Sequence, residues 1–309
     1  MNQTILGANG AIGIALAEEL SKYTNSIKLV SRNPKKVNPN DILFSADLLK
    51  TENVFKAIEN SSIVYVTIGF PYKTKIWQQQ WIPFMKSVIE ACLKYNSKLV
   101  FFDNIYSIGG DYVKHITEES PISPTSKKGA IRAEIVKLIL KNIEKNGLKA
   151  IIVRAPDFFG GTSYDNSIIT KLVFDKLKNG KKAQWLCNTN RIHSFAYVPE
   201  LAKGTAMLGN TEKAYNQIWN LPTDTSQLTG KEWIYLFAKE INCEPKFSTL
   251  PSWLFKILGI FVPNFKEIEE MNYQFDRDYF FDSSKFNNYF NYTPITNEEA
   301  VKQTVAKLK

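Results

Sequence analysis

Cysteine and histidine are scarce in this chain of 309 residues, which has three cysteines and two histidines. Cys92, Cys187 and Cys243 are far apart and show no Cys-x-x-Cys spacing, and the histidines are His115 and His193. Structural metal sites need clustered Cys and His ligands, and disulfide frameworks need more cysteines than this. The sequence therefore predicts neither a metal site nor a disulfide framework.

Long apolar runs are also missing. The longest, residues 253–262, is interrupted by Lys256 and is far shorter than the roughly 20 residues of a membrane-spanning helix. A strand is expected at residues 3–6, which leaves no room for a secretory signal before it. We therefore expect a cytoplasmic protein that has no membrane segment.

Arginine is rare as well, with five in the chain, so the net charge of +9 comes mainly from lysine. One explanation of such an excess is a nucleic-acid-binding surface. The lysines, however, are spread along the chain and alternate with Asp and Glu, which favours a solvated basic surface. We expect a small-molecule substrate and no nucleic-acid partner.

Short β-branched runs alternate with helical periodicity through the first half of the chain. This alternation is typical of a parallel sheet covered by helices on both faces. Six strands are predicted, at residues 3–6, 26–30, 42–44, 63–68, 98–102 and 149–153. Residues 15–20 and 77–95 are predicted helices, the second with a buried stripe of Trp81, Met85, Val88, Ile89, Cys92 and Leu93.

After about residue 160 the pattern changes to loops, aromatic stretches and single helices, at 229–241 and 251–261. The fold class predicted is therefore α/β, a doubly wound Rossmann-type parallel sheet with a smaller C-terminal substrate region. The expected division is a dinucleotide-binding domain at 1–160 and a partly interleaved substrate-binding region at 161–309.

Three glycines, Gly7, Gly10 and Gly13, lie between the first predicted strand and a helix. Gly7 permits a tight turn, Gly10 lets the backbone approach a pyrophosphate, and Gly13 lets the helix pack closely on the strand. Free amides at the helix start, around Asn9, Ala11 and Ile12, favour phosphate. The pattern predicts a dinucleotide site; a turn without a ligand is the alternative.

The second strand is followed by Ser31 and Arg32, where an enzyme that uses NAD usually has Asp or Glu for the ribose hydroxyls. A guanidinium suits a 2′-phosphate, and Ser31 could add a hydrogen bond. NADP(H) is therefore favoured over NAD(H), unless Arg32 is only a solvated loop charge.

The spacing Gly-x-x-Gly-x-x-Gly resembles that of the extended and atypical short-chain dehydrogenase/reductase superfamily, which includes nucleotide-sugar epimerases and dehydratases. The resemblance covers most of the chain. It implies that Asp47 and Leu48 pack beside the adenine, and that Thr67 and Gly69 lie beside the ribose. It also implies a homodimer.

The catalytic residues of this superfamily are an upstream Ser and a Tyr-x-x-x-Lys helix, and this chain departs at all three places. In the segment 120–134, which resembles the family's, Lys128 stands at the Tyr position and Arg132 at the Lys position, and Asn104 stands at the Ser position. The atypical branch, whose members often read Asp-Asn-x-Tyr and Lys-Gly-x-x-Arg-Ala, matches better than any sugar epimerase.

Two interpretations of these departures are open. In the first, Lys128 and Arg132 share a helix face, the like charge favours the neutral amine, and Lys128 exchanges a proton with a substrate oxygen that Asn104 and Tyr106 hold. In the second, Lys128 and Arg132 only bind phosphate and ribose, and the chain is a non-catalytic NADP(H)-binding sensor or scaffold. The first makes it an NADP(H)-binding oxidoreductase or epimerase/dehydratase-like enzyme for a small carbonyl, hydroxyl or nucleotide-linked substrate.

In the second half, residues 153–160 resemble the family segment that opens onto substrate, so Asp157 and Phe158 are expected near the pocket mouth. Residues 191–202 resemble another family stretch, with Glu200 expected to cap a helix. His193 is interpreted as structural rather than catalytic. Seven aromatic residues of the second half are interpreted as part of a hydrophobic core, and an apolar lid over the substrate is the alternative. They are Trp219, Trp253, Phe255, Phe261, Phe265, Tyr273 and Phe275.

Overall fold

The computed structural model describes residues 2–254, 267 and 269–308. The chain forms two compact units and passes between them several times. Unit 1 comprises Met1–Asn104, Ala130–Ala155 and Leu201–Leu221, and unit 2 comprises Ile105–Gly129, Pro156–Glu200 and Pro222–Lys309. The expected division at residue 160 stays a prediction about where the substrate region begins.

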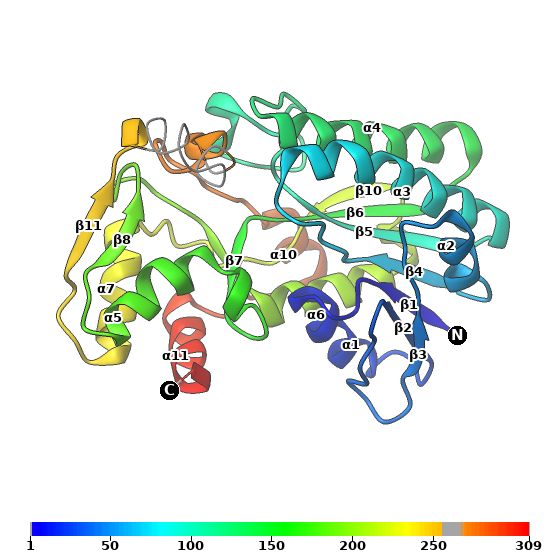
Figure 1. Ribbon diagram of the computed structural model, residues 1–309, viewed down its shortest axis with the longest axis horizontal. Helices are drawn as coiled ribbons and strands as arrows, with labels where there is room; N and C mark the ends of the chain where they lie inside the picture. Colours follow the sequence, from blue (N-terminus) through cyan, green and yellow to red (C-terminus); the bar gives the residue numbers. More distant parts are fainter. Residues whose placement is uncertain (1, 255–266, 268, 309) are drawn as a thin grey trace. The chain divides into compact units, whose positions relative to one another are not determined.

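Unit 1 is built on a seven-stranded sheet whose neighbouring strands are all parallel (Figure 1). Its order is β10-β6-β5-β4-β1-β2-β3. The strands are β1 Gln3–Leu6, β2 Ile27–Ser31, β3 Ile42–Ser45, β4 Ile63–Val66, β5 Lys98–Asn104, β6 Ala150–Ala155 and β10 Gln217–Asn220. All six predicted strands are present, and the predicted Rossmann-type sheet is confirmed.

Strand β10 is absent from the predicted strands because it lies after residue 160, outside the alternation of strands and helices in the first half of the chain. Trp219 on this strand is buried, and its indole N–H donates to the Ala214 carbonyl at 2.9 Å. The interpretation of Trp219 as a core residue is therefore confirmed.

Helices lie on both faces of the sheet, with α2, α3 and α4 on one and α1 and α6 on the other (Figure 1). Their bounds are α1 Ala11–Leu20, α2 Thr51–Ile58, α3 Thr74–Tyr95, α4 Lys127–Asn146 and α6 Val198–Gly209. The stripe predicted on α3 is buried apart from Leu93, which is half-buried. This apolar face of α3 packs against the sheet. The strands of a parallel sheet are apolar on both faces, so helices pack on each face of it.

Unit 2 has two small parallel sheets and several helices. β7 Asp157–Phe159 pairs with β9 Phe195–Tyr197, and β8 Ala183–Leu186 pairs with β11 Phe247–Leu250. Its helices are α5 Asp175–Lys178, α7 Gly230–Ile241, α10 Ser284–Phe290 and α11 Asn297–Leu308, with short helical turns at Gly110–Lys114, Tyr164–Asn166, Thr170–Phe174 and Asn272–Gln274. A further short turn, Glu212–Ala214, belongs to unit 1.

The core of unit 2 is aromatic, with Phe159, Phe195, Trp233 and Phe237 in edge-to-face contact. The predicted helix at 229–241 is α7. It begins with a capping box, in which the side chains of Thr229 and Glu232 each bind the backbone N–H of the other residue. The predicted helix at 251–261 falls mostly outside the described residues.

The remaining aromatic residues of the predicted cluster divide between core and surface. Tyr273 and Phe275 are buried, as the core interpretation expects, whereas Trp253 is 59% exposed. Phe255, Phe261 and Phe265 lie outside the described residues. In the part of the chain that the structure describes, no helix combines the length and the hydropathy needed to cross a bilayer.

Candidate functional site

The turn from β1 to α1 contains the three glycines. Gly7 has a φ of +99°, and a Cβ there would stand 2.5 Å from the Ile68 Cα. A Cβ at Gly13 would stand 2.6 Å from the Gly7 carbonyl oxygen. Both positions therefore need glycine for the fold itself.

Gly10 is different, because a Cβ there would meet nothing closer than 3.4 Å. It is the N-cap of α1, and neither a capping side chain nor an acidic residue occupies the first turn of this helix. The positive end of the helix dipole is thus left available to an anion. This is what a pyrophosphate site at Gly10 requires.

A cleft of about 290 Å³ opens beside this turn in unit 1. Eight of the predicted cofactor-binding residues line it: Gly7, Asn9, Gly10, Ser31, Arg32, Asp47, Leu48 and Gly69. Sequence reasoning missed six lining residues: Ala46, Leu49, Ile68, Phe70, Pro71 and Gln80. Most of these adjoin a predicted residue at the end of a strand, whereas Gln80 comes from α3 and gave no local signal.

Lys128, also predicted to bind the cofactor, belongs to unit 2 and does not line this cleft. Four further predicted residues, all in unit 1, are not in its lining either. Ala11, Ile12 and Gly13 are buried in the first turn of α1. Thr67 is half-buried, with its hydroxyl 3.3 Å from the Leu6 carbonyl oxygen. These residues hold the shape of the turn.

The polar groups of the cleft fit a phosphate-bearing dinucleotide. Arg32 is exposed, and within the described residues its guanidinium has no carboxylate partner. The Ser31 hydroxyl is buried and has no hydrogen-bond partner among those residues. Asp47 is turned to its own loop, since its carboxylate accepts the Leu49 N–H at 3.1 Å. A ligand with a phosphate near Arg32 would satisfy both groups.

Arg132, predicted as a site residue, is 4% exposed and forms an ion pair with Asp103 in unit 1. Its Nε and Nη2 lie 2.6 and 2.5 Å from Asp103 Oδ1, and the guanidinium stands 4.5 Å above the Trp81 ring. Burial is the main cause that raises the pKa of Asp103, and the Arg132 charge opposes this shift. A direct catalytic role for Arg132 stays a prediction.

Lys128, in the first turn of α4, belongs to unit 2 and is completely buried. Its Nζ donates to the carboxylates of Glu267 and Glu270, and Glu270 also accepts the Lys127 backbone N–H at 2.9 Å. Each of the two cations, Lys128 and Arg132, thus has carboxylate partners of its own, and a catalytic role for Lys128 stays a prediction. No sequence signal pointed to Glu267 or Glu270, which lie 139 and 142 residues further along.

The other two predicted catalytic residues belong to different units. Asn104 ends β5 in unit 1, and its backbone N–H donates to Asp103 Oδ1 at 2.9 Å. Tyr106 is half-buried in unit 2, and a Cβ at Gly129 would collide with its carbonyl oxygen. The Tyr106 loop therefore packs directly on the start of α4.

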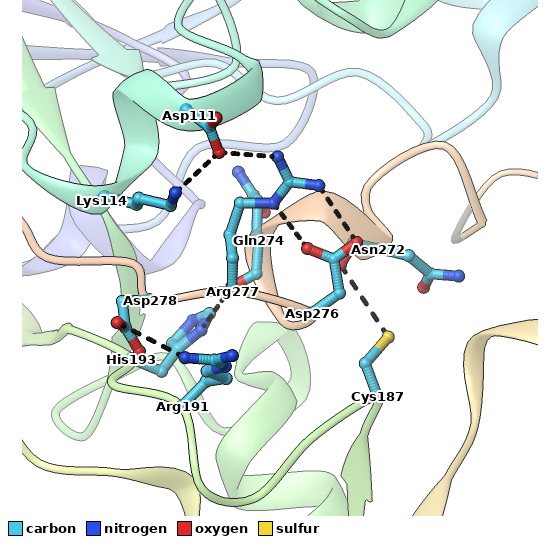
Figure 2. Close-up of polar contacts among 10 residues, drawn as sticks. All are labelled: Asp111, Lys114, Cys187, Arg191, His193, Asn272, Gln274, Asp276, Arg277 and Asp278. Atoms are coloured by element: carbon cyan, nitrogen blue, oxygen red, sulfur yellow. Dashed lines mark hydrogen bonds and ion pairs between the residues drawn. The ribbon is translucent and has the colours of Figure 1, made fainter.

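His193 is 2% exposed, and both of its ring nitrogens have partners: the Gln274 carbonyl and the Asp157 carboxylate (Figure 2 shows the first). The interpretation of a satisfied, structural histidine is confirmed. Glu200 lies inside α6, and its carboxylate binds the Tyr292 hydroxyl at 2.8 Å, so its expected role as a helix cap is corrected.

Comparisons with known proteins agree with this fold. Residues 4–221 match the model of the NAD dependent epimerase/dehydratase family. The uncharacterized UDP-glucose epimerase YtcB of Bacillus subtilis (strain 168) is 22% identical over 233 residues, which are 68% of this chain and 73% of that protein.

Solved structures show the same fold at low identity. The UDP-glucose 4-epimerase of Thermus thermophilus in complex with NAD has a TM-score of 0.79 at 16% identity, covering 99% of this chain and 98% of that one. The UDP-glucose 4-epimerase of Thermotoga maritima with UDP-glucose has a TM-score of 0.80 at 14% identity, covering 100% and 98%. The match to the family model spans well over half of the chain, and the cleft of unit 1 fits a nicotinamide dinucleotide. The chain therefore belongs to the NAD dependent epimerase/dehydratase family.

Proposed function

We propose that this chain is an NADP(H)-dependent oxidoreductase of the epimerase/dehydratase type that acts on a nucleotide-linked sugar. The observation that carries the proposal is the cleft of unit 1, where the glycine turn, the start of α1 and Arg32 together offer positive charge to a dinucleotide. The test is calorimetric titration with NADPH and NADH.

The preference for NADP(H) is supported by Arg32 and Ser31 at the end of β2. Arg32 is one of five arginines in the chain, and it lacks a carboxylate partner among the described residues. The buried Ser31 hydroxyl lacks a hydrogen-bond partner in the same part of the chain. A 2′-phosphate would accept from both, since a guanidinium binds phosphate oxygens in pairs.

A nucleotide-linked substrate is supported by the relatives. The Bacillus subtilis relative is named a UDP-glucose epimerase, and the Thermotoga maritima structure contains UDP-glucose. Among small carbonyl and hydroxyl compounds, this class is therefore the one to try first.

A bound nicotinamide dinucleotide supplies the hydride donor or acceptor. The residue proposed to move the accompanying proton is Lys128, which stands where the superfamily has Tyr. Lys128, held by Glu267 and Glu270, can donate a proton to a carbonyl oxygen that is being reduced. In the reverse step the neutral amine takes that proton back from the substrate hydroxyl. Asn104 and Tyr106 are proposed to hold the substrate oxygen.

A second candidate function is a non-catalytic NADP(H)-binding sensor or scaffold. It is favoured by the pairing of both cations that replace the superfamily's catalytic Tyr and Lys. Arg132 is paired with Asp103, and Lys128 is paired with two glutamates. Such a protein would bind the dinucleotide through unit 1 and turn over nothing.

One experiment separates the two candidates. The absorbance of protein-bound NADPH is followed while nucleotide sugars, ketones and aldehydes are added one at a time. Tight NADPH binding followed by oxidation establishes the enzyme, and tight binding without oxidation by any compound favours the sensor. Binding of neither dinucleotide would refute both.

We also propose an assembly and a compartment. The superfamily resemblance suggests a homodimer, and the sequence favours a cytoplasmic location. Light scattering during gel filtration tests the dimer. A monomer at micromolar concentration would refute that part alone.

A further inference from the structure

The Lys128 side chain is completely buried, although the proposed function gives it a proton transfer to substrate. The carboxylates of Glu267 and Glu270 lie against its ammonium group, and these two side chains are 21% and 17% exposed. All three residues belong to unit 2. The partly exposed glutamates therefore cover the buried lysine.

The hydrogen-bond donors of Lys128 are already in use. Its Nζ donates to the Glu267 carbonyl oxygen at 3.3 Å, to the Glu267 carboxylate and to the Glu270 carboxylate. An ammonium group has three N–H donors and a neutral amine has fewer, so these three acceptors occupy the group in either protonation state. A substrate oxygen can accept a hydrogen bond from Nζ only after one of these acceptors has left.

Glu270 has a fixed place at the start of α4. One of its carboxylate oxygens accepts from Lys128, and the other accepts the Lys127 backbone N–H at 2.9 Å. A carboxylate at this end of a helix is also stabilised by the helix dipole. The next residue, Met271, is 6% exposed and belongs to a buried apolar cluster with Ile105. Glu270 is therefore the partner that can stay with Lys128 while substrate binds.

Glu267 contributes more to the cover of Lys128 than Glu270 does. It supplies two of the three acceptors, its carbonyl oxygen and its carboxylate, whereas Glu270 supplies one. Departure of Glu267 would therefore free two N–H donors and leave one carboxylate to hold the lysine. Departure of Glu270 would free a single donor and also leave the Lys127 N–H without this partner.

We propose that Glu267 makes an autoinhibitory contact with Lys128, and that Glu270 is a positioning residue for the same ammonium group. A substrate oxygen takes the place of Glu267, while Glu270 keeps the Lys128 side chain at the start of α4. The inference rests on the proposed function, in which Lys128 moves the proton, and it adds a regulatory contact to that site.

The cover is tested first, by a measurement that does not depend on turnover. The full chain is treated with acetic anhydride, and tandem mass spectrometry reads the acetylation of Lys128 and of its exposed neighbour Lys127 separately. In the wild-type protein we expect Lys128 to react at least about tenfold more slowly than Lys127, and Glu267→Ala to raise the Lys128 rate by about tenfold, the factor for one lost charge-assisted hydrogen bond.

Glu269→Ala is the matched control for this measurement. It removes a nearby acid that makes no ion pair with Lys128 among the described residues. We expect it to leave the Lys128 rate unchanged, because the three acceptors around Nζ stay in place.

Turnover is then followed as the appearance of NADPH absorbance when UDP-glucose is mixed with the NADP⁺-loaded protein. In this direction the sugar carbon loses a hydride to NADP⁺, and its hydroxyl loses a proton to the Lys128 amine. We expect Glu267→Ala to raise the rate by about tenfold, because a hydrogen bond that competes with substrate is gone. Glu269→Ala should match the wild-type protein.

The positioning role of Glu270 has a separate readout. Glu270→Leu should lower the maximal rate while the half-saturating concentration of UDP-glucose stays the same. Glu270→Gln keeps an accepting oxygen and should restore most of that rate. A Glu270→Gln variant that is as slow as a folded Glu270→Leu variant would overturn the positioning role.

The outcomes separate the autoinhibitory contact from the proposed function. The contact is overturned if Lys128 reacts as fast as Lys127 in the wild-type protein, or if Glu267→Ala does not raise the Lys128 rate. If Glu267→Ala exposes Lys128 but neither protein turns over UDP-glucose or any other compound of the panel, the cover is supported and the proposed function fails. If turnover occurs and Glu267→Ala slows it, the function stands and the autoinhibitory role fails. A Glu267→Ala chain that does not fold is replaced by Glu267→Gln, for which the same two rates decide.

Discussion

Arg132 and Asp103 form a buried ion pair in unit 1, with Arg132 Nε 2.6 Å from Asp103 Oδ1. The two residues come from separate motifs, the Asp-Asn-x-Tyr stretch that ends β5 and the Lys-Gly-x-x-Arg-Ala stretch that begins α4. The pair joins strand to helix beneath the Trp77 and Trp81 rings. The joint occurrence of these motifs therefore has a structural reason, which is the pairing of their charges.

Breaking this pair should destabilise unit 1. Arg132→Met leaves the buried Asp103 carboxylate without its ion-pair partner, with only the charge of Arg154 still acting on it. Breaking a buried pair in this way costs about 3 to 5 kcal/mol. Urea unfolding followed by tryptophan fluorescence measures the loss, and Lys137→Met, an exposed change on the same helix, is the control. Equal stability of the two variants would contradict the burial of the pair.

The glycine turn offers a test that separates folding from binding. Gly7→Ala should destabilise the protein, because the new Cβ would meet the Ile68 backbone at a φ of +99°. Gly69→Ala, in the same cleft with nothing within 4 Å of its Cβ position, should not. Thermal unfolding distinguishes them.

Gly10→Val should leave the fold intact and abolish dinucleotide binding, since a Cβ there is tolerated but occupies the approach to the pyrophosphate. Calorimetry with NADPH checks the loss, and circular dichroism checks the fold. An unchanged affinity of Gly10→Val for NADPH would refute the assignment of the cofactor to this cleft.

Arg32→Asp should weaken NADPH more than NADH, by about 1.5 to 3 kcal/mol for a lost charge-assisted hydrogen bond. The control is Lys35→Asp, an exposed change in the same loop outside the lining of the cleft. If Arg32→Asp leaves the ratio of the NADPH and NADH affinities unchanged, the proposed preference for NADP(H) is refuted.

Lys128→Met should remove turnover while NADPH binding is kept, if Lys128 moves the proton. The change also leaves Glu267 and Glu270 without their buried partner, so stability is measured alongside activity. Lys127→Met is the matched control, because that side chain is exposed and only its backbone N–H binds Glu270. Retained activity in a folded Lys128→Met variant would assign the proton to another group, with Tyr106 the next candidate.

Cys187 should react slowly with thiol reagents at neutral pH. Burial, with a smaller effect of Asp276, raises the pKa of Cys187 to about 11, above the ordinary thiol value of 9.0. The pKa of this thiol is higher in the folded protein than in the unfolded chain. Its contribution to the free energy of unfolding is therefore fully present below pH 9.0 and is lost as the pH rises through about 11. Alkylation followed by peptide mass spectrometry should show a rate that rises up to that pH; fast reaction at neutral pH would contradict the burial.

Local features made much of the fold predictable. Six of the seven strands of unit 1 are short, largely apolar runs within a regular alternation of strands and helices, and the glycine spacing located the cofactor turn. The cleft contains eight of the residues predicted to bind the cofactor. Strand β10 and the cleft residue Gln80 gave no comparable signal, because neither continues a local pattern.

The sequence by itself determined the parallel sheet and the dinucleotide turn, because both depend on side-chain periodicity and on backbone angles within a few residues. The partners of the charged groups were decided only by the tertiary structure. Any of 30 acidic residues could have met Lys128, Arg132 or His193. Folding brought Glu270 to Lys128, Asp103 to Arg132 and Asp157 to His193 across 142, 29 and 36 residues, and a buried charge is stable only beside such a partner.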